Sequence, residues 1–104
     1  MSDPLAKFKR KVIAVDVDGE TVHVRTWSVG ERMEFSRASG DKSGTLAQLA
    51  LRLSVCDESG KPFYTEADTE RLAEVDGVPA EKIIDAALEL NGLKSKTLAD
   101  AKKA

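Results

Sequence analysis

The sequence predicts one small α+β domain, in which an N-terminal β-hairpin is followed by about four α-helices. The hairpin is indicated by two alternating apolar and polar runs on either side of Asp18-Gly19, a dipeptide typical of two-residue hairpin turns. The helices are indicated by apolar residues that recur at helical spacing between capping residues, glycine and proline. We place the domain at residues 11–93, between a flexible basic arm at residues 1–10 and a frayed basic tail at residues 94–104.

The composition excludes several classes of protein. Hydrophobic residues make up 41% of the 104 residues and charged residues 33%, which favours a folded domain over a disordered chain. No apolar run approaches the roughly 20 residues that a membrane-spanning helix needs. A formal net charge of −2 gives no general attraction to nucleic acid, and the single Cys56 fits a reducing cytoplasm. We therefore expect neither a membrane nor a nucleic acid as a partner.

Charge is unevenly distributed along the chain. The arm and the tail are basic, whereas ten acidic residues between Asp57 and Glu89 face only three basic ones. Two interpretations stay open at this point. The acidic residues form solvated helix faces with solubilising ends on either side, or opposite charges attract copies of the chain or a basic partner.

The expected hairpin runs from Lys11 to Trp27. Its two-residue turn predicts the register, with Val17 opposite Glu20, Val15 opposite Val22 and Ile13 opposite Val24. Ile13 and Val15 then share one apolar face with two valines of the second strand. Because an isolated hairpin is marginally stable in water, this one should pack on the helices or extend a sheet across copies.

The first helix is predicted by Ser28 and Glu31, which have the spacing of a capping box, and should run to about Ala38. The polar stretch SGDKSG that follows (39–44) predicts a loop.

The next helix is the most apolar of the chain and should run from Leu46 to about Cys56. Thr45 and Gln48 again have capping-box spacing. Apolar residues cover most of its circumference, including Leu46, Leu49, Ala50 and Leu53 on one face. It is therefore either a core helix wrapped by the rest of the fold, or a helix shared between the core and a subunit interface.

The segment Asp57–Tyr64 has the acidic, glycine and proline residues of a turn, across which the residue pairs 55–56 and 63–64 can form a minimal hairpin. Thr65, with Asp68 three residues later, predicts another helix start. The buried side of that helix is expected to be Leu72, Ala73 and Val75.

The last main helix should begin near Pro79, which suits a first helical turn, and end at Asn91-Gly92, with Leu93 folding back on it. Its apolar face is expected to comprise Ile83, Ile84, Ala87, Leu88 and Leu90.

The sequence offers no convincing catalytic or ligand site. Cys56 and His23 are the minimum for a thiol nucleophile with a base, but no motif accompanies them, and Cys56 is better explained as a small core residue. No Cys/His pair has metal-ligand spacing, and DESG (57–60) lacks the alternating oxygen ligands of a calcium loop. We therefore expect no enzymatic activity, no cofactor and no metal.

Three stretches of the sequence resemble the tail assembly chaperones of long-tailed, lambda-like phages and prophages. They are VHVRTWSVGERMEF (Val22–Phe35), LALRLSVCDESGKPFYTEADTERLAEV (Leu49–Val75) and IIDAALELNGL (Ile83–Leu93). The most specific pieces are the CDESGKPF segment after an apolar helix, the TEAD cap and AALELNGL before a charged tail. The likeness covers most of the expected domain and neither of its basic ends.

The resemblance implies a non-enzymatic chaperone in the cytoplasm of the bacterial host, absent from the mature virion. Such proteins self-associate and bind the tape measure protein, which they keep soluble until the tail tube polymerises around it. In many relatives a longer frameshift product recruits the tail tube protein. Two alternatives stay open: a structural connector of the tail or capsid, and an adaptor with an acidic docking face.

The residues expected to contact a partner or another copy follow from the breadth of the apolar faces and not from a transferred motif. They are Leu46, Leu49, Leu53, Ile83, Ala87, Leu90, Ile13 and Val15.

Overall fold

The β-hairpin forms in the register that its turn predicts. The structure, a computed structural model that describes residues 3–41 and 45–93, contains strands β1 (Val12–Val17) and β2 (Glu20–Arg25). All the expected pairs are present: Val17 with Glu20, Val15 with Val22 and Ile13 with Val24. Asp18 and Gly19 both have positive φ, at 52° and 84°, as a type I′ turn requires.

A short third strand completes the sheet. β3 (Val55–Cys56) pairs antiparallel with β2, so the strand order is β1-β2-β3. The local pairing expected with residues 63–64 lies one residue earlier, because Cys56 bridges Pro62 and the amide of Phe63 donates to the carbonyl of Val55 (3.3 Å). Cys56 is thus a strand residue and not a helical one, since it is held between two extended neighbours.

Helix α1 (Val29–Asp41) begins at the predicted capping box. The Ser28 amide donates to the Glu31 carboxylate (2.8 Å), and the Glu31 amide donates to the Ser28 hydroxyl (3.2 Å). The helix continues past Ala38, so the first half of the expected loop is helical, and residues 42–44 lie outside the described residues. Serine and glycine disfavour a helix by only about 1 kcal/mol per residue or less, which is too little to end one.

Helix α2 (Leu46–Ser54) lies in the core of a single chain. Its residues Leu49, Ala50, Leu51 and Leu53 are buried. Thr45 is the N-cap residue, as predicted, but the expected capping box is not formed, because the Thr45 side chain makes no capping hydrogen bond. The helix ends two residues early, at the point where the chain becomes extended to join the sheet.

The helix expected after Thr65 is replaced by two 3₁₀ turns, η1 (Glu66–Asp68) and η2 (Arg71–Glu74). Of the three residues expected on its buried side, Leu72 is buried but Ala73 and Val75 are exposed. One buried anchor is not enough to hold a longer helix against the core, so the described residues contain three α-helices and not four.

Helix α3 (Gly77–Leu90) ends where predicted and begins two residues before Pro79, at Asp76-Gly77, where the sequence predicts the end of the preceding helix. The Asp76 carboxylate accepts from the amide of Val78 (3.1 Å), and the chain turns at Gly92, where φ is 75°. The amide of Leu93 reaches back to the carbonyl of Leu88 (2.7 Å), which is the bond of a Schellman turn.

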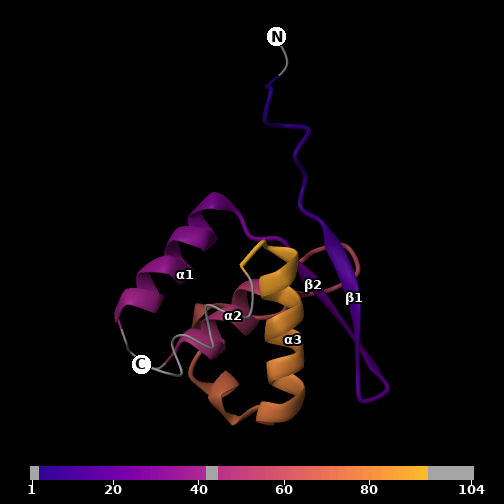
Figure 1. Ribbon diagram of the computed structural model, residues 1–104, viewed down its shortest axis with the longest axis vertical. Coiled ribbons are helices and arrows are strands. Elements are labelled where there is room, and N and C mark those ends of the chain that lie inside the picture. The colour runs from indigo at the N-terminus through magenta and orange to yellow at the C-terminus, as the bar shows by residue number, and fades with distance from the viewer. Residues whose placement is uncertain (1–2, 42–44, 94–104) are drawn as a thin grey trace.

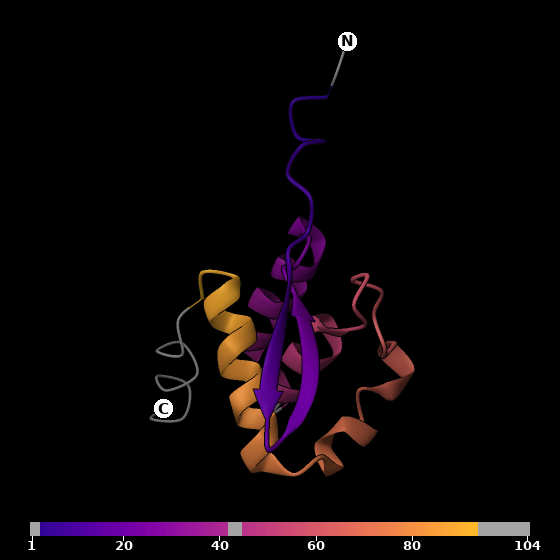
Figure 2. The same ribbon diagram turned by 90° about the vertical axis from the view of Figure 1, so that its right-hand side faces the viewer.

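The hairpin packs along the side of α3 that faces away from α1 (Figure 1). α2 lies between α1 and α3, and the 3₁₀ turns close the far end of the domain (Figure 2). The arm, residues 3–10, projects from the start of β1 away from the body in both views. The α+β prediction is confirmed, with the core centred on α2, α3 and Trp27.

We expect Leu53→Ala to destabilise the domain by about 2–5 kcal/mol, because the Leu53 side chain is 2% exposed and its removal leaves a cavity. Met33→Ala is the control, since Met33 is 57% exposed, and it should change stability by less than about 0.5 kcal/mol. Urea unfolding followed by circular dichroism measures both. Equal effects of the two substitutions would contradict the assignment of α2 to the core.

Candidate protein-binding surface

A buried arginine joins four segments of the fold. Arg25, at the end of β2, has a side chain that is 9% exposed. Its guanidinium donates to the carbonyl of Leu53 (3.1 Å), to the carbonyl of Gly60 (3.2 Å) and to the carboxylate of Glu31 (2.8 Å). Burial lowers the pKa of Arg25, and the charge of Glu31 opposes that shift. The first residues of α1 are thereby fixed against the sheet, because Glu31 also caps the helix.

A buried asparagine performs the same task for the other end of the domain. The Asn91 side chain accepts from the amide of Trp27 (2.6 Å) and donates to the carbonyl of Ala87 (2.8 Å). The backbone carbonyl of Asn91 accepts from the guanidinium of Arg32 (2.7 Å). The end of α3 and the start of α1 are therefore held side by side by hydrogen bonds.

Trp27 and Phe35 provide the apolar part of this junction. Their ring centroids are 4.7 Å apart, and the Trp27 indole donates to the hydroxyl of Ser54 (2.7 Å). Arg52 of α2 and Glu34 form an ion pair farther along α1. These contacts use one face of α1 and leave the opposite face without cover from the described residues.

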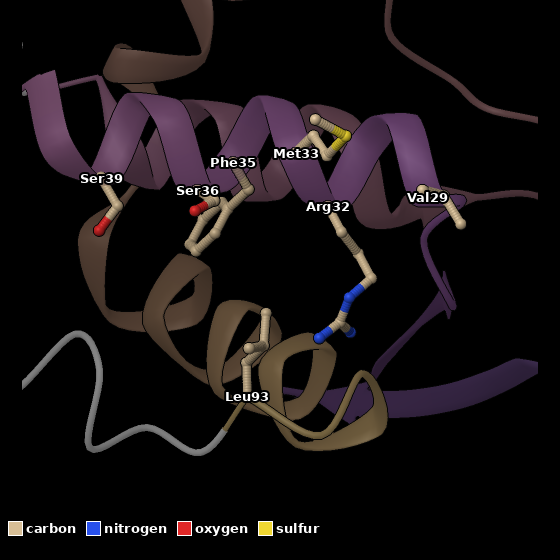
Figure 3. A pocket seen from close by; sticks show the side chains of 7 residues that line it. All are labelled: Val29, Arg32, Met33, Phe35, Ser36, Ser39 and Leu93. Carbon is tan, nitrogen blue, oxygen red and sulfur yellow. The ribbon is translucent and has the colours of Figure 1, made fainter.

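An open groove, which we call the α1 groove, lies between α1 and the turn after α3. Leu93 points toward α1, while Phe35 and Arg32 point from α1 toward it (Figure 3). The groove has a volume of about 460 Å³ and is lined by Val29, Arg32, Met33, Phe35, Ser36, Ser39 and Leu93.

The α1 groove presents two large apolar side chains to solvent. Val29 is 76% and Met33 57% exposed, one helical turn apart, although both are large apolar side chains. Phe35 is buried and gives the groove an aromatic floor. An apolar, open groove beside a helix suits the apolar stripe of another helix, and the flexible Met33 can adapt to it.

The residues that the sequence predicted as contacts do not line the α1 groove. Leu49, Leu53 and Ala87 are buried in the single chain. Leu46, Ile83, Leu90 and Val15 are half-buried, and Ile13 is 38% exposed. Their contact with a partner stays a prediction, but the surface that they offer is small. Sequence reasoning placed no contact in the α1 groove, for which the only signal was an apolar pair at i and i+4.

The described residues offer little to other chemistry. Cys56 is free and buried, and burial raises the pKa of its thiol, which disfavours the reactive thiolate. Among residues 3–41 and 45–93, no cluster of three or more His, Cys, Asp or Glu side chains is placed to hold a metal ion. No helix in the same part of the chain has the length and apolarity to cross a membrane.

The turn bound by Arg25 depends on an ionised carboxylate. The Asp57 side chain accepts from the Ser59 hydroxyl (2.7 Å), from the Ser59 amide (2.8 Å) and from the Lys61 amide (3.0 Å). The Ser59 hydroxyl bond, followed by the Lys61 amide bond, lowers the pKa of Asp57. The turn is therefore stabilised by the charged form of Asp57.

We expect the stabilisation by Asp57 to disappear in acid. Because the folded-state pKa is below the unfolded value of about 3.9, the contribution is complete above that value and is lost as pH falls through the folded pKa. Asp57→Asn should thus be less stable than the unchanged protein at pH 7, with the difference shrinking at pH 3. Urea unfolding at both pH values measures it, and an identical difference at the two would contradict this role.

Comparison with known proteins extends the argument to the fold. No model of a known protein family matches the sequence, and no curated protein sequence matches it significantly. A solved structure described as "Structure of bacteriophage HK97 tail assembly chaperone" superposes with a TM-score of 0.61 and 18% sequence identity, over 79% of this chain and 80% of that chain. At this identity the similarity establishes a shared fold. The solved HK97 structure is that of a tail assembly chaperone, the class of protein that the sequence motifs resemble.

Proposed function

We propose that this protein is a non-enzymatic phage tail assembly chaperone. The observation that carries the proposal is the fold shared with the HK97 protein over about four fifths of both chains. The proposal is supported by the sequence segments CDESGKPF, TEAD and AALELNGL, which resemble those of tail assembly chaperones.

In this proposal the protein acts in the cytoplasm of the bacterial host. It binds the tape measure protein, keeps it soluble until the tail tube forms around it, and is absent from the finished virion. It self-associates so that many copies cover one long client. A longer frameshift product, where one is made, recruits the tail tube protein.

The α1 groove is the surface that we assign to the tape measure protein. A long helical client exposes apolar stripes, and such a stripe fits a groove bordered by Val29 and Met33 with Phe35 as its floor. Among the described residues that line the groove, Arg32 is the only charged one, so an acidic residue beside the stripe would be favoured. Both apolar border residues are already exposed, so binding needs no unfolding of the domain.

Co-expression with the tape measure protein encoded on the same genome tests the proposal. We expect the tape measure protein to be insoluble alone, and to be soluble and co-purified when this chain is present. Met33→Asp places a charge in the α1 groove and should reduce co-purification about tenfold or more, without loss of fold.

Val78→Asp is the matched control, because Val78 is 65% exposed, lies on α3 and does not line the α1 groove. It should retain the client. If the tape measure protein stays insoluble with the unchanged chain, the chaperone function is wrong. If the two variants lose the client equally, the function stands and the α1 groove is not its site. Detection of this chain in purified virions would favour a structural connector instead.

A further inference from the structure

The N-terminal arm carries two large apolar side chains that the body of the protein does not cover. Leu5 is 69% and Phe8 72% exposed, and they lie three residues apart on the segment that projects from β1 (Figures 1 and 2). The arm, residues 3–10, has three basic side chains and one acidic one. We expect an exposed leucine and phenylalanine on a cationic segment to pack on another surface.

The base of the arm is firmly attached to the hairpin. The Thr26 amide donates to the carbonyl of Lys11 and the Lys11 amide donates to the Thr26 hydroxyl, both at 2.9 Å. Arg10 forms an ion pair with Glu31 (3.0 Å). The arm therefore leaves the body at the end of the hairpin opposite its turn, in a fixed direction.

A second groove lies where β2, β3 and the segment that follows β3 meet. It has a volume of about 400 Å³ and is lined by Thr21, Val22, His23, Val55, Cys56, Asp57, Glu58, Phe63 and Tyr64. We call it the β2–turn groove. Phe63 is 63% exposed beside the half-buried Tyr64, with ring centroids 6.4 Å apart. Asp57 and Glu58 give the groove an acidic border.

We propose that the arm of one copy docks in the β2–turn groove of a second copy. The apolar pair Leu5 and Phe8 would pack on Phe63 and its neighbours, while the lysines of the arm approach the acidic border. The inference rests on the self-association included in the proposed function, and it identifies the two surfaces involved.

The directions of the two surfaces favour a second copy over the same chain. The base of the arm lies beside the turn at Gly60, which is close to Val12, but the arm points away from the body and leaves Leu5 and Phe8 exposed, so it does not occupy the groove of its own chain. An arm and a groove at different places on one molecule make a head-to-tail contact. Such contacts repeat, so they generate a ring or a chain of copies. Each contact involves only a short segment and is therefore weak on its own.

Sedimentation velocity of the purified full-length protein over a concentration series tests the proposal. The unchanged chain should associate with rising concentration, and less at high salt because the charges are screened. Phe8→Ser in the arm and Phe63→Ser in the groove should each weaken association about tenfold or more while leaving the fold intact, since both side chains are exposed. Val78→Ser, which removes a 65% exposed side chain from α3 outside both grooves, is the control and should have no effect.

Mixing the two variants gives the decisive measurement. The Phe8→Ser chain keeps an intact groove and the Phe63→Ser chain keeps an intact arm. The two variants should therefore form heterodimers in a 1:1 mixture, whereas neither variant should dimerise alone. Absence of heterodimers, or unchanged association of the Phe8→Ser chain, would overturn the proposal. An effect of Val78→Ser as large as that of Phe63→Ser would also overturn it, because the loss would not be specific to the arm and the groove. The measurement uses no tape measure protein, so its failure is separate from a failure of the chaperone function.

Discussion

The fold depends on the buried guanidinium of Arg25. A guanidinium that is taken out of water is tolerated only when its donors are satisfied and its charge is balanced. Arg25 meets this condition only where the end of α2, the turn at Gly60 and the capped start of α1 converge on the end of β2. Shifting any of these segments would leave a buried donor of Arg25 without a partner. The arginine therefore specifies one arrangement of elements whose apolar surfaces alone would accept several.

The same constraint explains why apolar surface remains outside. Polar links at Arg25 and Asn91 fix the orientation of the first turn of α1, and Phe35 is the residue that this orientation turns inward. Val29 and Met33 then lie on the exposed side of α1, at the border of the α1 groove. A helix anchored by hydrogen bonds can leave an apolar stripe exposed at little cost to the fold, and such a stripe is available for binding.

Local chemistry made much of this fold predictable. The turn at Asp18-Gly19 determines the hairpin register, and the capping box at Ser28 and the stop at Gly92 mark helix ends by contacts within a few residues. The sequence could not predict the roles of Arg25 or the third strand. Strand alternation places Arg25 on the face opposite the one that carries Ile13 and Val15, and Arg25 is buried because segments 28 and 35 residues away cover it. The candidate grooves were missed for the same reason, since each joins elements distant in the chain.

The uneven distribution of charge acquires a physical meaning in the structure. Because the basic arm projects away from the body, its attraction to the acidic border at Asp57 and Glu58 is satisfied best by a second molecule. The α1 groove uses other residues, and its lining shares none with the β2–turn groove. A copy joined to its neighbours through the arm would therefore still present Val29 and Met33 to a client. A chain of weak contacts that leaves each client groove open supplies many binding sites along one long partner, whose combined affinity exceeds that of any single site.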